Sequence, residues 1–309
     1  MASPAFIAHS ILKLLFVISS LFHTSFGARK LTGVFEPTPI QLTYHSGPLM
    51  SGNIPVNCVW YGSFTPSQRS IITDFILSLS PSQPESQPSV ATWFTTIKGY
   101  YPLAQGRNAA SLSVSLGTQT LDEGYSLGKS LSHAQIEQLA SSAFQTNAIV
   151  IVLTADDVLV ENFCLICGNH ASSNNTYVYI WVGNSAAQCP GRCAWPFNEP
   201  INGPQDPPLV APNDDIGMDG MVINVAALVP GAISNPFGDG IFQGVATAPL
   251  EACTACRGIY GLGAYPGYPG KLLVDVASGA SYNAIGVNNR MYLVPAMFSP
   301  ATSTCVTSF

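Results

Sequence analysis

The sequence has little charge. Only 9% of its 309 residues are Asp, Glu, Lys or Arg, against about 25% in a typical soluble domain. With 11 Lys and Arg residues and a net charge of −6, the chain cannot form the large basic face that nucleic-acid binding requires. Hydrophobic residues still make up 47%, so the composition excludes a disordered chain and supplies enough apolar side chains for a full core.

Long apolar runs are scarce as well. The longest one, residues 11–22, is broken by Lys13 and is shorter than the roughly 20 residues that a membrane-spanning helix needs. It matches the hydrophobic part of a secretory signal peptide, and Ser25 and Gly27 supply the small residues before a cleavage site. A permanent N-terminal anchor is the alternative. Because no second run of that length is evident, we expect no membrane insertion.

Hydrophobic periodicity predicts helices and strands in irregular alternation. The predicted strands are 56–61, 111–116, 148–153, 176–182, 272–276 and 291–294, and the predicted helices are 66–79, 89–101, 133–144 and 218–229. This order favours an α+β fold, a single domain with a mixed sheet and packed helices, over a doubly wound parallel sheet. The predicted parts of the chain are a signal peptide (1–27), an extended N-terminal segment (28–55) and a single domain (56–309).

All eight cysteines lie after residue 27. An even number in a secreted chain predicts disulfide bonds, although the spacing does not reveal the pairing. The disulfide candidates are Cys58, Cys164, Cys167, Cys189, Cys193, Cys253, Cys256 and Cys305. Close pairs such as Cys164-x-x-Cys167 also resemble zinc ligands, which a reducing compartment would favour. The sequence Asn174-Asn175-Thr176 predicts N-glycosylation at Asn174, in keeping with secretion.

Signatures of catalysis are missing too. The sequence contains no Gly-x-Ser-x-Gly nucleophile turn, no phosphate-binding loop and only three histidines after residue 27. We interpret one of them, His170, as a surface or hydrogen-bonded loop histidine rather than a ligand. The densest acidic cluster, formed by Asp214, Asp215 and Asp219, could bind calcium or supply glycosidase acids. We favour a helix N-terminus there, because acids stabilise its dipole and its free N–H groups.

Several long segments together resemble one plant family. They are LTYHSGPLMSG (42–52), VWYGSFTPSQRSIITDF (59–75), TADDVLVENFCLICGNHAS (154–172), YIWVGNSAAQCPGRCAWPF (179–197), GPQDPPLVAPNDDIGMDGMVINVAALVPGAISNPF (203–237) and GLGAYPGYPGKLLVDVASGASYNAIGVNNRMYLVPAMFSP (261–300). On these segments the chain resembles the EXORDIUM and EXORDIUM-like proteins, also called the phosphate-induced protein family. The resemblance implies an apoplastic, cell-wall-associated protein linked to cell expansion and to brassinosteroid-, phosphate- or sugar-responsive growth. It brings no established catalytic residues with it.

A shorter segment, residues 224–236 (NVAALVPGAISNP), resembles the active-site helix of secreted zincin-type proteins. On that pattern the first histidine position is Ala227, the glutamate position is Leu228 and the next ligand position is Gly231. None of these residues can bind zinc or act as a base. The resemblance implies a degenerate zincin-like scaffold without its metal chemistry, and we expect Pro230 to end or kink the helix.

Together these observations predict a secreted, disulfide-stabilised, non-catalytic protein with no cofactor and no metal. We expect it to regulate growth by binding a cell-wall polysaccharide, a small ligand or a receptor ectodomain. Two alternatives stay open. One is a carbohydrate-binding module, for which the tryptophans could supply stacking surfaces. The other is a wall-acting hydrolase that uses Asp214, Asp215, Asp219 or Asp239.

Secretion through a signal peptide predicts a defined mature N-terminus. N-terminal sequencing of the protein collected from apoplastic fluid should begin near Ala28. Protein that still starts at Met1 and sediments with membranes would indicate an uncleaved anchor instead. The Gly27→Arg variant removes the small residue before the cut, so it should be cleaved poorly and serves as the control.

Overall fold

The structure is a computed structural model that describes residues 39–104, 111–201 and 207–308. Its compact unit is Ile40–Phe309. The unit begins earlier than the predicted boundary at residue 56, because Leu42 and Leu49 of the predicted extended segment are buried in the core. The predicted signal peptide over 1–27 lies outside the described residues.

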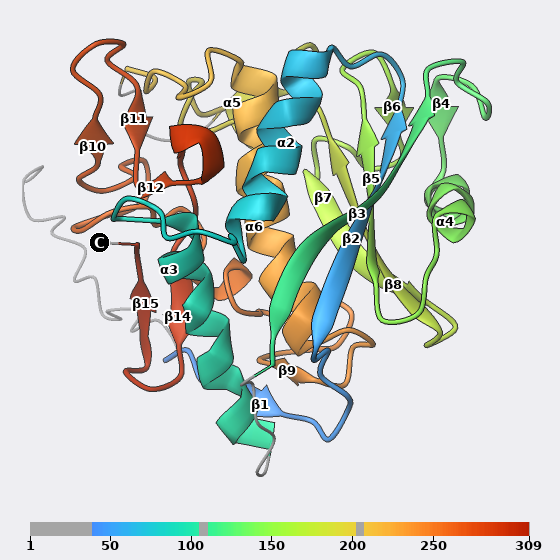
Figure 1. The fold of residues 1–309 in the computed structure, drawn as a ribbon, viewed down its shortest axis with the longest axis horizontal. Helices are drawn as coiled ribbons and strands as arrows, with labels where there is room; N and C mark the ends of the chain where they lie inside the picture. The colour runs from blue at the N-terminus through green and yellow to red at the C-terminus, as the bar shows by residue number, and fades with distance from the viewer. Residues whose placement is uncertain (1–38, 105–110, 202–206, 309) are drawn as a thin grey trace, which may run out of the picture. The chain divides into compact units, whose positions relative to one another are not determined.

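The centre of the unit is a five-stranded mixed sheet with the order β3-β2-β5-β8-β7 (Figure 1). In chain order its strands are β2 (Asn53–Tyr61), β3 (Ser113–Asp122), β5 (Ile149–Thr154), β7 (Gly168–Ser173) and β8 (Tyr177–Gly183). Strands β2, β3, β5 and β8 run parallel to one another, whereas the edge strand β7 is antiparallel to β8. Strands β5 and β8 are almost continuously apolar because both of their faces are covered. The α+β class is confirmed, with more parallel pairing than the irregular order of elements suggested.

Two capped helices lie in the connections between the parallel strands. α2 (Pro66–Ser78) follows β2, and Thr65 and Gln68 form a capping box at its N-terminus. α4 (His133–Ser142) precedes β5 and is capped in the same way by Ser132. The two helices lie on opposite sides of the sheet (Figure 1). Two parallel strands can be joined only by a long crossover connection. The capping residues that begin α2 and α4 therefore also mark the crossovers between the parallel strands.

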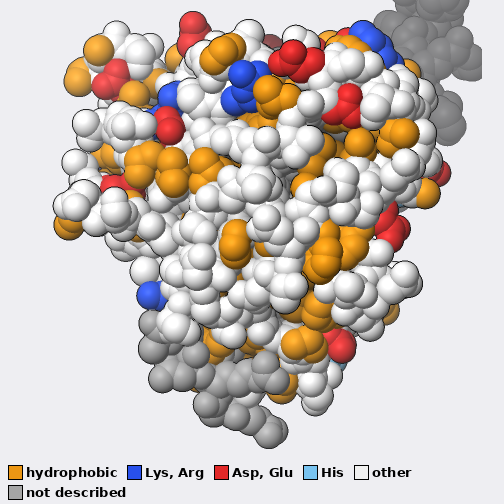
Figure 2. All heavy atoms as spheres, turned by 45° about the vertical axis from the view of Figure 1, so that its right-hand side comes forward, with side chains coloured by type: hydrophobic (Ala, Val, Ile, Leu, Met, Phe, Trp, Pro, Cys, Tyr) orange, Lys and Arg blue, Asp and Glu red, His pale blue; other side chains and the backbone are white. Residues whose placement is uncertain are grey.

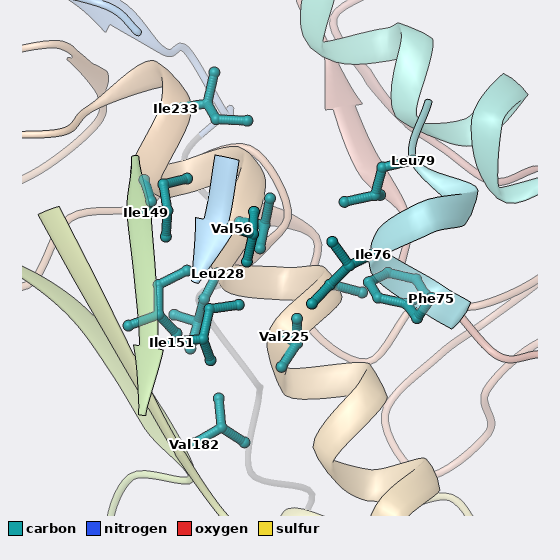
Figure 3. Close-up of a cluster of buried hydrophobic side chains, with 14 of the residues drawn as sticks. Val56, Phe75, Ile76, Leu79, Ile149, Ile151, Val182, Val225, Leu228 and Ile233 are labelled. Atoms are coloured by element: carbon teal, nitrogen blue, oxygen red, sulfur yellow. The ribbon is translucent and has the colours of Figure 1, made fainter. Parts of the chain in front are cut away.

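A third helix, α6 (Ile216–Ser234), packs on β7 and β8 and against α2. Its Val225 and Leu228 share one cluster of buried side chains with Ile76 of α2 and Ile151 of β5 (Figure 3). Among the described residues, α6 is the one helix that is long and apolar enough to cross a membrane. However, 83% of its most apolar window is buried inside the protein. Its apolar surface is therefore used for internal packing.

The helix α6 does not end at Pro230, contrary to one of the outcomes expected from the sequence. It continues to Ser234, whose hydroxyl donates a hydrogen bond to the Pro230 carbonyl (2.9 Å). A proline cannot give the helical hydrogen bond to the carbonyl four residues earlier. Because almost every residue of this last turn is buried, tertiary packing outweighs that loss.

The remaining elements are short. They are α3 (Val90–Phe94), η1 (Thr95–Ala104), α5 (Pro190–Cys193), η2 (Thr254–Cys256), η3 (Val287–Asn289), and the strand pairs β1 (Thr43–Tyr44) with β9 (Ile241–Phe242), β4 (Ser130–Leu131) with β6 (Leu159–Val160), β10 (Leu273–Val274) with β11 (Ser281–Tyr282), β12 (Ala284–Ile285) with β13 (Met291–Tyr292), and β14 (Met297–Ser299) with β15 (Thr304–Val306). The helix predicted over 89–101 is thus divided into α3 and the 3-10 helix η1. The late strands predicted at 272–276 and 291–294 are two residues long.

Three disulfides are formed by six of the eight candidate cysteines. The pairs are Cys164–Cys189, Cys167–Cys193 and Cys256–Cys305. The remaining two, Cys58 and Cys253, are free and buried, so the prediction of disulfides is wrong for them. Burial raises the pKa of the Cys58 thiol to about 12 and also raises that of Cys253. Both thiols therefore stay protonated and behave as small apolar core groups.

Charged side chains contribute little to the surface. Figure 2 shows one face on which apolar and uncharged side chains predominate and charged ones are scattered. Arg69 and Glu123 form an ion pair with a separation of 3.7 Å, and Lys129 pairs with Asp157. Such pairs contribute little to stability, because solvent and salt screen charges near the surface. Stability therefore depends mainly on the buried core and the disulfides.

A buried acid fixes the start of α6. Asp219 accepts hydrogen bonds from the backbone N–H and the side-chain amide of Asn213 (2.9 and 2.6 Å). The side-chain oxygen of Asn213 accepts from Arg290, which is also ion-paired with Asp74 of α2 (2.9 Å). Burial raises the pKa of Asp219 to about 7, and burial of the carboxyl group likewise raises the pKa of Glu85 to about 7.

These two carboxyl groups predict an unusual dependence of stability on pH. Below about pH 7 they retain a proton in the folded protein, whereas an unfolded carboxyl group releases it near pH 4. Their contribution to the free energy of unfolding should therefore fall as the pH rises from about 4 to 7. The maximum slope is about 1.4 kcal/mol per pH unit for the buried Asp219, and the contribution of the more exposed Glu85 is reduced by solvent screening.

Urea unfolding across this pH range tests the role of Asp219. Asp219→Asn should remove its part of the pH dependence, so that stability falls less between about pH 4 and 7 than in the unmodified protein. Asp156→Asn changes an exposed acid and should leave the pH dependence unchanged. If all three proteins lost stability equally over this range, the assignment to Asp219 would be wrong.

Candidate binding cleft

A cleft of about 520 Å³ lies where α6 passes the beginning of the edge strand β7. Four segments line it: the loop before β7, α5 with the residues after it, the middle of α6, and the stretch around η2. The principal lining residues are Leu165, Ile166, Arg192, Trp195, Asn224, Ala227, Leu228, Thr254, Arg257 and Tyr260. A volume of this size is typical of a small-molecule site.

Disulfides frame the cleft. Cys164–Cys189 and Cys167–Cys193 join the loop before β7 to α5, and Cys167 and Cys193 themselves line the cleft. A third disulfide, through Cys256, fixes η2. Cross-linked walls have little conformational freedom left to lose when a ligand binds, so the cleft is preorganised.

Two of the three zincin-like positions line this cleft. Ala227 and Leu228 contribute only hydrocarbon side chains to its wall. The third position, Gly231, has no side chain at all. These residues supply neither a metal ligand nor a general base. The degenerate zincin-like scaffold itself stays a prediction.

A buried, hydrogen-bonded histidine–carboxylate pair lies behind Gly231. His170 Nε2 is 2.9 and 2.8 Å from the two carboxylate oxygens of Glu251, and both side chains are more than nine-tenths buried. The Asn235 side-chain amide donates a further hydrogen bond to Glu251 (2.6 Å). Because a carboxylate only accepts, Nε2 of His170 carries the proton. His170 therefore lies in strand β7 with a buried partner, and its interpretation as a loop histidine is wrong.

The absence of a side chain at Gly231 is required by this pair. A Cβ atom at residue 231 would lie 2.6 Å from Oε2 of Glu251 and 3.5 Å from Nε2 of His170. The space that the third ligand of the zincin pattern would occupy is thus filled by Glu251, which comes from a different part of the chain. The pair links β7, α6 and the segment before η2.

The acidic cluster acts mainly on α6. Asp215 is the N-cap of the helix and accepts from the Met218 N–H (2.9 Å), as predicted. Asp219 is buried and bonded to Asn213, whereas Asp239 follows the other end of the helix. The 19 residues of α6 span about 28 Å, far more than the roughly 5–10 Å that separates glycosidase carboxylates. Within the described ranges, no three His, Cys, Asp or Glu residues are placed to hold a metal ion.

The cleft carries positive charge. Arg192 and Arg257 line it, both residues are exposed, and no Asp, Glu or His lies among its lining residues. Within the part of the chain that the structure describes, neither guanidinium forms an ion pair or a side-chain hydrogen bond. Trp195 and Tyr260 add two aromatic rings whose centroids are 5.7 Å apart. By contrast, a smaller cavity of about 230 Å³ beside Phe237 has no charged lining residue.

The predicted glycosylation site is accessible. Asn174 lies in the exposed turn between β7 and β8 and has a positive φ of 46°. The turn is closed by a hydrogen bond from the Thr176 N–H to the Ser173 carbonyl (2.8 Å). A glycan attached there would point into solvent without disturbing the core, and its presence stays a prediction.

The chain matches the family described as Phosphate-induced protein 1 conserved region over residues 42–308. The chain belongs to this family. It is 57% identical over 311 residues to Protein PHOSPHATE-INDUCED 1 of Nicotiana tabacum, covering 97% of this chain and 98% of the relative. It is 53% identical over 306 residues to Protein EXORDIUM of Arabidopsis thaliana, covering 95% and 97%. No solved structure matches the chain significantly.

These matches confirm the family resemblance, but the two arginines in the cleft of this phosphate-induced protein 1 family member were not foreseen from its sequence. Arg192 directly precedes Cys193, and Arg257 directly follows Cys256. Their position beside disulfide cysteines was the one sequence signal that could have indicated a fixed binding surface, because a disulfide holds the neighbouring residues in place. His170 and Glu251 are 81 residues apart, so nothing local in the sequence connects them.

The close packing at Gly231 predicts a loss of stability in Gly231→Ala. The added methyl group would collide with Glu251, so we expect the free energy of unfolding to fall by roughly 1–3 kcal/mol. This loss should appear although alanine favours a helix over glycine by about 1 kcal/mol. Gly124→Ala, in an exposed turn with nothing within 4 Å, is the matched control for urea unfolding. An unchanged or raised midpoint for Gly231→Ala would contradict the packing described here.

Proposed function

We propose that this protein is secreted into the plant cell wall, where it regulates cell expansion by binding rather than by catalysis. Its relatives include proteins named EXORDIUM and PHOSPHATE-INDUCED 1, which supports a role in plant growth. The three disulfides support an oxidising, extracellular compartment. The family resemblance links this role to brassinosteroid-, phosphate- or sugar-responsive growth.

The make-up of the cleft is the observation that carries the proposal. Hydrolysis needs a nucleophile or an activated water together with a general acid or base. Ala227 and Leu228 can provide neither, and the free thiol of Cys253 is buried with a raised pKa. The hydroxyl oxygen of Thr254 already accepts a hydrogen bond from the Glu251 N–H (2.8 Å). Such a lining favours ligand binding over catalysis.

Filling the cleft should abolish biological activity. Ala227→Trp places an indole in the cleft, so it should fail to restore growth in plants that lack their own copy of the gene. Val276→Trp introduces the same side chain at an exposed residue outside the cleft, and it should restore growth. The amount of secreted protein and its urea unfolding curve are measured for both variants, so that misfolding is recognised. A folded, secreted Ala227→Trp protein that restores growth would overturn the proposal.

The exposed acids provide the complementary test against a hydrolase. Asp214 and Asp239 are exposed, and Asn tolerates the positive φ of 54° at residue 214. The double variant Asp214→Asn/Asp239→Asn should therefore fold, be secreted and restore growth. If this variant folds normally yet loses growth activity, a hydrolase that uses these acids becomes the better explanation.

A further inference from the structure

The lining of the cleft also indicates what it binds. We infer that its ligand is a small organic carboxylate with an apolar body. This inference rests on the proposed binding function and specifies the ligand class for the same cleft. It follows from three features: two arginines without acidic partners in the described part of the chain, exposed apolar walls, and polar side chains that are partly engaged within the protein.

The arginines define the charged end of the ligand. The chain has 17 acidic against 11 basic residues, and Arg69 and Arg290 are ion-paired within it. Arg192 and Arg257 instead have no acidic partner in the described part of the chain, although both lie on one cleft. A guanidinium binds a carboxylate through two parallel hydrogen bonds, which are among the strong ones in proteins. Two such groups on the wall of one cleft in an acidic protein therefore favour an anionic ligand.

The walls define the apolar body. Leu165 is 72% exposed and Ile166 is 38% exposed at the loop that lines the cleft. Ala227 and Leu228 continue this apolar surface on α6, and Trp195 adds an aromatic ring. Covering apolar surface is favourable by about 25 cal/mol per Å². A bare inorganic anion such as phosphate could bind the arginines, but it would leave these apolar side chains in water.

Some of the polar groups of the cleft are already engaged within the protein. The Asn224 amide donates to the carbonyls of Gly220 (2.7 Å) and Cys193 (3.0 Å). The Thr254 hydroxyl oxygen accepts from the Glu251 N–H. A hydroxyl group that is buried without a partner costs about 1–3 kcal/mol, and each sugar unit carries several hydroxyls. The lining therefore favours an apolar acid over a wall polysaccharide.

Titration calorimetry on the full-length mature protein tests the ligand class with 2-naphthoate as the probe. 2-Naphthamide has the same rings without the charge, and acetate has the charge without the rings. We expect 2-naphthoate to bind at least about tenfold more tightly than either, as expected when a charge-assisted hydrogen bond or a buried ring is lost. Equal binding of acetate would mean a simple anion site, and equal binding of 2-naphthamide a simple apolar site. Either result overturns the inference.

Arginine variants locate the binding site. Arg192→Gln and Arg257→Gln should each weaken 2-naphthoate binding at least about tenfold and leave 2-naphthamide binding unchanged. Lys98→Gln removes the same charge from an exposed residue that does not line the cleft, so it should bind like the unmodified protein. Unfolding curves verify that all variants are folded. Unaffected binding in both arginine variants would place the ligand elsewhere and overturn the inference.

Failure of the ligand class and failure of the proposed function give different results. Oligogalacturonate that binds through Arg192 and Arg257, while 2-naphthoate does not, would replace the apolar acid by an acidic glycan and preserve a binding function. If 2-naphthoate binds as expected but Ala227→Trp blocks it without affecting growth, the ligand class holds and the proposed function fails. Tight 2-naphthoate binding that Ala227→Trp abolishes together with growth activity supports both.

Discussion

Burial of α6 against the mixed sheet is the packing contact on which the rest of the molecule depends. The chain has too few charges for ion pairs to hold it together, and nearly all residues of α6 are buried. Its neighbours approach from both parts of the chain, α2 before it and η2 after it. Asn224, Ala227 and Leu228 are spaced i, i+3 and i+4, so they share the one side of the helix that meets the cleft.

Local sequence signals predicted much of this fold. Thr65 followed by Pro66, and Ser132 before its helix, mark helix starts through hydrogen bonds that span only three residues. The apolar runs of β5 and β8 likewise identify central strands without further information. The helix predicted over 89–101 was less successful, because a window of that length does not distinguish α-helix from the 3-10 turns that follow α3.

The features that sequence reasoning missed are non-local. Cys58 was expected to pair because the count of cysteines is even, but its place inside the central strand β2 encloses it in the core. His170 and Glu251 meet only because β7 and the segment before η2 pack on the same helix. The cleft was indicated only in part. The positions Ala227 and Leu228 pointed to it, whereas its arginines lie in the short helix α5 and directly after η2, whose placement depends on disulfides.

The composition of α6 has a consequence for how such a chain is made. A helix whose most apolar 18-residue window has a mean hydropathy of 1.6 can be retained by a translocation channel as a membrane span while the chain is still unfolded. Asp219, Asn224 and Pro230 oppose retention, because polar groups and a missing backbone donor are costly in lipid. For the secretion proposed above, the groups that interrupt the apolar sequence of α6 would let this segment pass through a membrane and still be apolar enough for a protein core.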